Sequence, residues 1–512
     1  MKPKVLIAIV PRIQDDFGYT PAGPALIKGS LVKHGFDCKV LDLNRELDTL
    51  YQDKKEELVP IENWFINYNF YSYKVFKIID TLVNQWCEEI LAWNPTHVGI
   101  SVFSYNSQRA TIMLATMLKS KNPDVQIFIG GAGIATDFRF PEQCKNEKII
   151  DAYIRGEGEI AVVEYLKGNL EYPGINGKAP KQIEDIENLN YPDYSDYELQ
   201  NYTNKKGLVA LPITGSRGCV RHCTFCDIAS MWPKYKFRSG KSIAEEIKQQ
   251  VDRYGVRAFR FTDSLVNGSM KAFREMTDEL SKFRTSLDDD KKFIWDSHFI
   301  VRSKEQMPPE DFKIMKESGA GTLLIGVESG SPTVREHMKK GYSDEDLEYS
   351  LEQIFKNKIK VRFLMIIGYP TETREDFNMT LEMFKKYQKY SSNLIEEINL
   401  GLTLNLLPNT PLYNEAEKYG LETSKEHIND WVCKQNPTLN FEERLRRRIE
   451  AQYFIETLGY KVFESKNYTR ALAIAWSQVK NLKSKKIQID ADKLKFDREQ
   501  GGLIVPDPHR TY

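Results

Sequence analysis

The chain has 512 residues, of which 41% are hydrophobic and 28% are charged. This is the balance of a soluble globular protein, and the length predicts two or three domains rather than one core. Lysine plus arginine and aspartate plus glutamate each number 72, so the net charge is zero. A neutral chain has no overall field to attract nucleic acid or an anionic membrane, and we expect neither as a partner.

Cysteine usage and the start of the chain predict a reducing compartment. The number of cysteines, seven, is odd, and three of them lie close together, which is typical of a metal or redox site rather than a disulfide framework. The apolar run at 5–10 is too short for a signal peptide and predicts a buried strand. No stretch approaches the ~18 apolar residues of a membrane span. We therefore expect a soluble, cytoplasmic protein.

Residues 1–170 alternate strand and helix signals. Strands are predicted at 5–10, 39–43, 96–103, 126–129 and 149–154, and helices at 24–34, 74–92 and 107–120. This alternation favours an α/β, Rossmann-like doubly wound parallel sheet. Ligands in such sheets bind beyond the carboxyl ends of the strands.

Two segments interrupt the alternation. Residues 46–73 are rich in aromatic residues and asparagine, and predict either a helical insertion packed on the domain or a wall that faces a substrate. Residues 171–206 contain prolines, glycines and acids without a clear period, and predict a linker.

Residues 207–430 again repeat strand–helix units. Strands are predicted at 209–214, 258–262, 293–300, 322–327, 360–367 and 397–404, and helices at 242–254, 270–285, 309–318, 344–357 and 374–387. The repetition favours a full or partial (β/α) barrel, whose active site lies at the carboxyl ends of the strands. Residues 431–512 predict a small helical C-terminal extension, with a charged helix at 441–459 and a loose tail.

The loop after the first predicted barrel strand contains Cys219, Cys223 and Cys226, with the spacing C-x3-C-x2-C. Three thiolates in so short a loop can bind three irons of a 4Fe–4S cluster. The fourth iron keeps open positions that can chelate a small molecule, as an open zinc site does. A structural zinc site with His222 or a distant residue as the fourth ligand is the lesser alternative, because the sequence has no second cysteine pair and His222 lies between two of the ligands.

This spacing, with Phe225 directly before the last cysteine, resembles that of the radical S-adenosylmethionine (SAM) superfamily. In that family the open iron chelates SAM, and one electron from the cluster cleaves SAM to a 5′-deoxyadenosyl radical. Later segments resemble the family in the expected order. The resemblance implies SAM-binding roles for Phe225, Asp263, Glu328, Ser329, Met365 and Gly368. A structural role is an equal alternative for Asp263, and a cap or salt-bridge role is the lesser alternative for Glu328.

Residues 1–170 resemble the cobalamin-binding module that precedes the radical domain in one large subgroup of this superfamily. The resemblance implies a cobalamin site at Ser101, Gly130, Gly131, Gly133 and Glu157. The sequence lacks the Asp-x-His-x-x-Gly signature that supplies a histidine to cobalt, so cobalt would bind without one. The alternatives are an empty Rossmann-like domain or a nucleotide site, although no Gly-x-Gly-x-x-Gly follows the first strand.

Two further features are predicted to be structural. Acids flank the basic run at 444–448, so a solvated helix face is favoured over an RNA or lipid patch. The remaining cysteines show no ligand spacing and are predicted to be buried apolar groups; they are Cys38, Cys87, Cys144 and Cys433.

Together these features predict a radical SAM enzyme with a 4Fe–4S cluster, SAM and cobalamin as cofactors, and favour methylation of an unactivated carbon. The alternatives are a radical SAM enzyme without cobalamin (a cyclase, a rearrangement enzyme or a methylthiolating enzyme) and a non-catalytic iron–sulfur sensor. The expected partners are a small-molecule or peptide substrate and an electron donor such as flavodoxin or ferredoxin. No catalytic residue is assigned beyond the cluster ligands.

Overall fold

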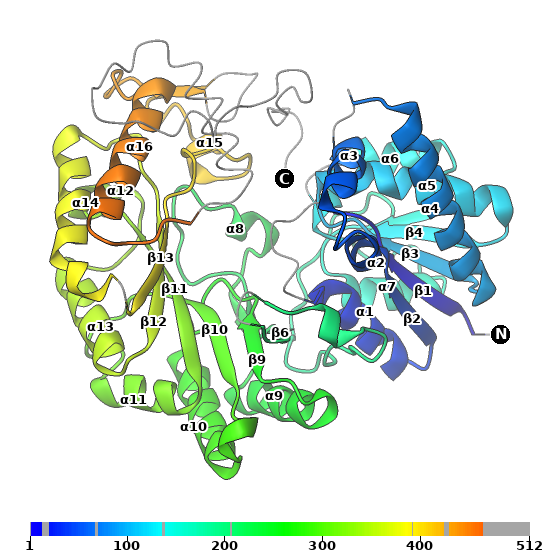
Figure 1. Cartoon of the computed structure of the whole chain (residues 1–512), viewed down its shortest axis with the longest axis horizontal. Helices are drawn as coiled ribbons and strands as arrows, with labels where there is room; N and C mark the ends of the chain where they lie inside the picture. Colours follow the sequence, from blue (N-terminus) through cyan, green and yellow to red (C-terminus); the bar gives the residue numbers. More distant parts are fainter. Residues whose placement is uncertain are drawn as a thin grey trace. The chain divides into compact units, whose positions relative to one another are not determined.

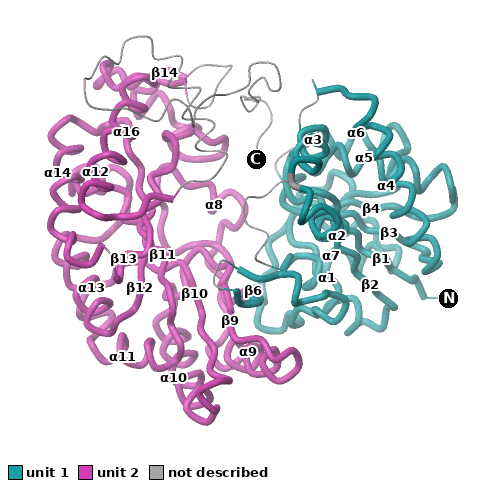
Figure 2. Tube along the Cα trace, viewed as in Figure 1, with its two compact units in different colours: residues 1–212, 510–512 teal, residues 213–509 magenta. Residues whose placement is uncertain are grey.

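The computed structural model describes residues 2–12, 20–66, 70–135, 139–204, 207–391, 393–423 and 430–463. The chain forms two compact units, of which the first ends at Pro212 and the second begins at Ile213 (Figure 2). Each unit combines helices with a parallel sheet (Figure 1). None of the described helices is both long and apolar enough to cross a membrane.

The first unit is built on five parallel strands. They are β1 (Lys4–Ile9), β2 (Asp37–Asp42), β3 (His97–Ser101), β4 (Gln126–Gly130) and β5 (Ala152–Ile154). The order in the sheet is β2-β1-β3-β4-β5. The chain reverses its direction across the sheet between β1 and β3, and such a switch point is the usual ligand site of open α/β sheets.

Helices surround this sheet. They are α1 (Ala22–Lys33), α2 (Leu43–Leu50), α3 (Lys55–Ile66), α4 (Tyr73–Ala92), α5 (Gln108–Lys121), α6 (Arg139–Asn146) and α7 (Gly158–Leu166). Leu6 and Ala8 share one apolar core with α4 and α5. The alternate residues Val5 and Ile7 are also buried but lie outside that core, as expected for a sheet covered on both faces. The predicted Rossmann-like sheet is confirmed.

The described residues of the aromatic-rich segment 46–73 include the end of α2 and all of α3. Trp64 and Phe65 of α3 are buried in the core shared with α4, which is the packed insertion that the sequence predicts.

Residues 171–204 contain little regular secondary structure, but several contacts attach them to the first unit. Lys28 of α1 pairs with Asp196 at 2.5 Å. The Tyr202 hydroxyl donates to Asp42 Oδ2 at 2.7 Å. The segment predicted as a linker therefore packs on the first unit over its described length.

The second unit is built on a larger parallel sheet. Its strands are β6 (Ala210–Ile213), within which the boundary between the units falls, β9 (Ala258–Phe261), β10 (Ile294–Phe299), β11 (Ala320–Glu328), β12 (Lys360–Met365) and β13 (Ile395–Asn399). Two short ribbons are formed by β7 (Ser216–Arg217) with β8 (Lys236–Phe237), and by β14 (Leu421–Thr423) with β15 (Trp431–Cys433). The main sheet has the order β13-β12-β11-β10-β9-β6, so β6 and β13 are edges of a six-stranded partial barrel. This confirms the partial form of the predicted barrel.

Helices lie between and after these strands. They are α8 (Ile228–Met231), α9 (Gly240–Tyr254), α10 (Met270–Ser286), α11 (Pro309–Glu317), α12 (Pro332–His337), α13 (Asp344–Lys356), α14 (Arg374–Lys386), α15 (Pro411–Asn414) and α16 (Phe441–Thr457). Each β-strand–helix repeat brings the carboxyl end of a strand to the same edge of the sheet. The loops that follow β6, β9, β11 and β12 therefore meet at one edge.

Candidate functional site

The three cysteines lie on the loop between β7 and α8, beyond the carboxyl end of β6. Cys219, Cys223 and Cys226 are partly exposed and none forms a disulfide. Gly218 begins the loop with φ 84°, and a Cβ there would lie 2.8 Å from the Lys234 carbonyl oxygen. Only glycine meets both conditions without strain.

The thiols of this loop are close enough to influence one another. Burial raises the pKa of Cys226 to about 11, and the charges of Cys223 and Cys219 add to the rise. Burial also raises the pKa of Cys223. These thiols would stay protonated at neutral pH unless a cation such as iron stabilised the thiolates.

The three thiols suit a cluster better than a single metal ion. Among the described residues, no group of three His, Cys, Asp or Glu side chains surrounds one metal ion. A 4Fe–4S cluster does not require such convergence, because each thiolate binds a different iron. Three neighbouring thiols on one polar loop therefore fit a 4Fe–4S cluster.

Thr224, which the sequence did not single out, anchors the cysteine loop to residues that are distant in sequence. It is fully buried, and its Oγ1 lies 2.8 Å from the Tyr369 hydroxyl. Its main-chain N–H donates to Met338 O at 3.1 Å, and its carbonyl accepts the N–H of Leu412 at 2.9 Å. The neighbouring Phe225 packs against the apolar cluster that includes Met338 and Tyr369. No local pattern marks Thr224, because all its partners are distant in sequence.

Asp263, after β9, is 3% exposed. Its Oδ2 accepts the main-chain N–H of Gly215 at 2.9 Å, and its Oδ1 accepts the Ser216 hydroxyl at 2.5 Å. Burial raises the pKa of Asp263 to about 7, against the lowering effect of these two donors. Both carboxylate oxygens therefore hold the backbone that leads into the cysteine loop.

Glu328, the last residue of β11, adopts the left-handed conformation with φ 65°. Such a backbone is uncommon outside glycine and is typical of functional sites. A register shift between Gly326 and Glu328 places Glu328 opposite Met365 of β12. Glu328 is 7% exposed, and its Oε1 pairs with Lys340 Nζ at 3.0 Å. Burial alone would lower the pKa of Lys340, but the charges of Glu328, Cys223 and Tyr342 and the hydrogen bond to Glu328 together raise that pKa above its usual range.

Ser329 is fully buried inside the turn that follows Glu328. Its Oγ accepts the N–H of Ser331 at 3.1 Å, and its carbonyl oxygen accepts Arg335 Nη1 at 2.9 Å. These contacts fix the turn from β11 into α12.

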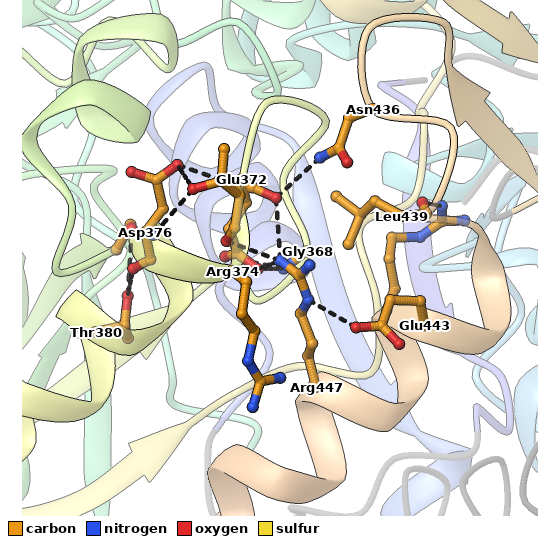
Figure 3. A network of polar contacts seen from close by, with 12 residues as sticks. Gly368, Glu372, Arg374, Asp376, Thr380, Asn436, Leu439, Glu443 and Arg447 are labelled. Carbon is orange, nitrogen blue, oxygen red and sulfur yellow. Dashed lines mark hydrogen bonds and ion pairs between the residues drawn. The ribbon is translucent and has the colours of Figure 1, made fainter.

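Gly368 lies on the turn that follows β12, next in the sheet to β11. The main-chain N–H of Gly368 donates to both carboxylate oxygens of Glu372, at 3.1 and 3.2 Å. Arg447 of α16 donates to the same carboxylate at 3.1 Å (Figure 3). Burial raises the pKa of Glu372 to about 7, although Arg447 opposes the rise. Met365, at the end of β12, is 4% exposed.

The basic run of α16 is not a solvated face, so that prediction is wrong. Arg444, Arg447 and Arg448 are 0%, 4% and 1% exposed. They are spaced i, i+3 and i+4 and share the inward face of the helix. Of the run's four arginines only Arg446 is exposed, and it pairs with Glu443 at 2.7 Å. The same spacing continues to the buried Ala451 and Ile455. These two apolar residues were the signal in the sequence that this face of the helix is buried.

In the first unit, the glycines of the predicted cobalamin site pack two loops together. Ser101 and Gly130 are register partners at the carboxyl ends of β3 and β4. A Cβ at Gly131 would lie 2.6 Å from a carbonyl oxygen of the loop after β3. A Cβ at Gly133 would lie 2.8 Å from a main-chain nitrogen of the same loop. These two glycines therefore allow the loops after β3 and β4 to lie against each other.

Glu157 precedes α7, and its carboxylate accepts the main-chain N–H of Ile183. Phe103, in the loop after β3, is 43% exposed. The Arg12 guanidinium carbon lies 4.3 Å from the centroid of the Phe103 ring. The carboxyl edge of β3 thus presents an exposed aromatic ring and small residues, which suits a flat, largely apolar ligand face.

Of the remaining cysteines, Cys87, Cys144 and Cys433 are buried, as predicted, whereas Cys38 is only partly buried.

A parallel partial barrel that presents three cysteines beyond its first strand, with polar turns after its second, fourth and fifth strands, defines a radical SAM enzyme. Residues 213–384 match the Radical SAM superfamily.

Relatives and solved structures extend the likeness beyond residues 213–384. An uncharacterized methyltransferase from Pyrococcus horikoshii is 26% identical, over 60% of this chain and 69% of the relative. An anaerobic magnesium-protoporphyrin IX monomethyl ester cyclase from Rubrivivax gelatinosus is 25% identical, over 61% of this chain and 58% of the cyclase. The fold resembles that of the radical SAM methyltransferase TsrM from Kitasatospora setae, with a TM-score of 0.62 and 15% identity over 93% of this chain and 96% of TsrM.

Proposed function

We propose that the protein is a cobalamin-dependent radical SAM enzyme that methylates an unactivated carbon. The observation that supports this most is the combination of both units in one chain. A radical SAM barrel with a three-cysteine loop follows a 2-1-3-4-5 parallel sheet, and the fold resembles, over 93% of the chain, a methyltransferase solved with cobalamin and a [4Fe–4S] cluster bound.

In this proposal residues 1–170 form the cobalamin module, 171–206 the linker, 207–430 the radical domain and 431–512 the extension. When bound, the cluster and SAM supply a carbon radical and cobalamin supplies a methyl group. Cys219, Cys223 and Cys226 hold three irons. Asp263 fixes the backbone before them through Gly215 and Ser216.

The other residues proposed to bind SAM lie at strand ends or on loops at the same edge of the sheet. Phe225 and Met365 supply apolar surface, and the buried turns at Ser329 and Gly368 supply rigid backbone. Glu328, held by Lys340, supplies a buried carboxylate that can accept hydrogen bonds from a ribose or amino group. In the first unit, Ser101, Gly130, Gly131, Gly133 and Glu157 form or support the edge proposed for cobalamin.

The proposed setting is a reducing cytoplasm, where free cysteines and a reduced cluster persist. An electron donor such as flavodoxin or ferredoxin would reduce the cluster. The substrate would be a small molecule or a peptide.

Anaerobic reconstitution with iron and sulfide tests the proposal. The reduced protein should convert SAM to 5′-deoxyadenosine, and a chain with all three cluster cysteines changed to alanine should not. Protein from cells grown with cobalamin should show corrin absorbance. A reconstituted protein that leaves SAM intact would contradict the enzyme assignment, and one without corrin would contradict the cobalamin assignment alone.

A second candidate is a radical cyclisation, favoured by the relative named as a cyclase. Methylation produces S-adenosylhomocysteine together with 5′-deoxyadenosine, because SAM also supplies the methyl group. Cyclisation produces no S-adenosylhomocysteine, so product analysis separates the two.

A further inference from the structure

Helix α16 places three arginines inside the second unit. Arginine is seldom fully buried without partners, and here much of the bonding goes to backbone carbonyl groups. Arg444 Nη1 donates to Trp431 O at 2.9 Å and to Leu439 O at 2.8 Å. Arg448 Nε donates to Gly401 O at 2.7 Å, in the loop after β13. Helix α16 therefore fastens loops at the carboxyl edge of the sheet.

Arg447 fastens the turn after β12. Its Nη1 donates to Glu372 O at 3.0 Å, to Glu372 Oε1 at 3.1 Å and to Thr373 O at 3.0 Å (Figure 3). Asn436 adds a second contact, from its Nδ2 to Glu372 O at 2.9 Å. Glu372 is completely buried, so Arg447 is the charge that balances its carboxylate.

Glu372 passes this restraint to Gly368. Its two carboxylate oxygens both accept the Gly368 N–H, which closes the turn on itself. Gly368 has φ 81°, and a Cβ there would lie 2.7 Å from Arg444 Cγ. The turn is therefore closed by hydrogen bonds to Glu372, and Arg444 of α16 packs against Gly368.

The same turn also reaches the cysteine loop. The Tyr369 hydroxyl lies 2.8 Å from Thr224 Oγ1 and donates to His337 O at 3.2 Å. Thr224 stands between Cys223 and Cys226 in the sequence. A continuous set of contacts thus runs from Arg447 through Glu372 and Tyr369 to the cluster ligands.

We propose that Arg447 is a positioning residue for SAM: through Glu372 it fixes the turn at Gly368, so α16 of the C-terminal region is part of the cofactor site. This inference rests on the proposed binding of SAM at the Gly368 turn. Arg447 need not touch SAM. Its effect is geometric, because a displacement of about 1 Å in a binding element can cost a large factor in rate.

The test uses the reconstituted full-length protein with Arg447→Gln, and with Arg446→Gln as the matched control on the same helix. Equilibrium dialysis measures the dissociation constant of SAM, and the rate of 5′-deoxyadenosine formation gives KM and kcat. Iron per chain and the melting temperature are measured in parallel. Arg447→Gln should weaken SAM binding about tenfold and raise KM, with iron content unchanged. Arg446→Gln should bind SAM within about twofold of the wild type.

Arg447→Lys provides the second variant if Arg447→Gln does not fold. Lysine retains the buried charge opposite Glu372 but lacks the planar fork that serves several acceptors at once. It should fold, retain the cluster and bind SAM more weakly than the wild type. SAM affinity within twofold of the wild type in a folded Arg447 variant overturns the inference, as does loss of SAM binding only in step with loss of iron. A wild-type protein that does not cleave SAM would instead refute the proposed function.

Discussion

Asp263 offers the sharpest test of how the cysteine loop is held. Asp263→Ala removes two hydrogen-bond acceptors. The Gly215 N–H and the buried Ser216 hydroxyl then lose the carboxylate to which they donate. A buried donor without a partner costs about 1–3 kcal/mol, so the variant should lose about 3 kcal/mol of unfolding free energy. The Ser216 hydroxyl also lies 3.4 Å from Leu265 O, and this second acceptor limits the loss of unfolding free energy that Ser216 causes.

Asp263→Asn should be far milder. Its amide oxygen can still accept the Gly215 N–H, and its amide nitrogen can donate to a Ser216 hydroxyl that turns toward Leu265 O. We expect a loss of about 1 kcal/mol in urea unfolding, with near-normal iron content. Asp263→Ala should bind clearly less iron after reconstitution, and the exposed Asp252→Asn on α9 should match the wild type.

The pH dependence of the unfolding free energy provides a second test of Asp263. The pKa of Asp263 is raised to about 7, so the folded protein keeps a proton that the unfolded chain releases near its ordinary pKa of about 4. Its contribution to stability is therefore greatest at acid pH and is lost as pH rises toward 7. The wild type should lose unfolding free energy over this range relative to Asp263→Asn. If Asp263→Ala kept both stability and iron but lost SAM binding, the carboxylate would contact SAM rather than hold the loop.

Three further outcomes are expected. Cys223→Ala should fold but retain far less iron than the wild type after reconstitution; normal iron content would exclude Cys223 as a ligand. Glu328→Gln or Lys340→Met should each cost about 3 kcal/mol in urea unfolding because each leaves a buried charge unpaired, and the double variant should recover part of that loss; strictly additive losses would contradict the pairing. Gly133→Ala should lower stability by about 1–3 kcal/mol and weaken corrin binding, because its Cβ meets backbone at 2.8 Å, whereas Gly23→Ala has open space and should change neither; equal behaviour of the two would contradict the packing role.

Local patterns predicted much of the architecture. Alternating apolar strands and helices are properties of short windows, and they led to the Rossmann-like sheet and the partial barrel. The cysteine spacing is equally local, because one loop of eight residues supplies the three thiols. The first five barrel strands were located to within a few residues; the last covers Ile395–Asn399 rather than 397–404.

Contacts between distant residues could not be predicted in this way. Arg447 and Glu372 are 75 positions apart, so no window containing one reveals the other. The flanking acids made the basic run of α16 look solvated, whereas folding brings backbone carbonyls to three of its arginines.

The sequence by itself determined the order of strands and helices, since that order depends on periodicity, and the spacing of Cys219, Cys223 and Cys226 singled them out as candidate cluster ligands. Only the tertiary structure decided that Asp263 accepts hydrogen bonds from the residues before the cysteine loop. It also decided that the glycines after β4 let two loops pack together, and that α16 holds the turn at Gly368. The physical reason is that a buried polar group must find its partner wherever the fold brings one, and chain order does not specify where that is.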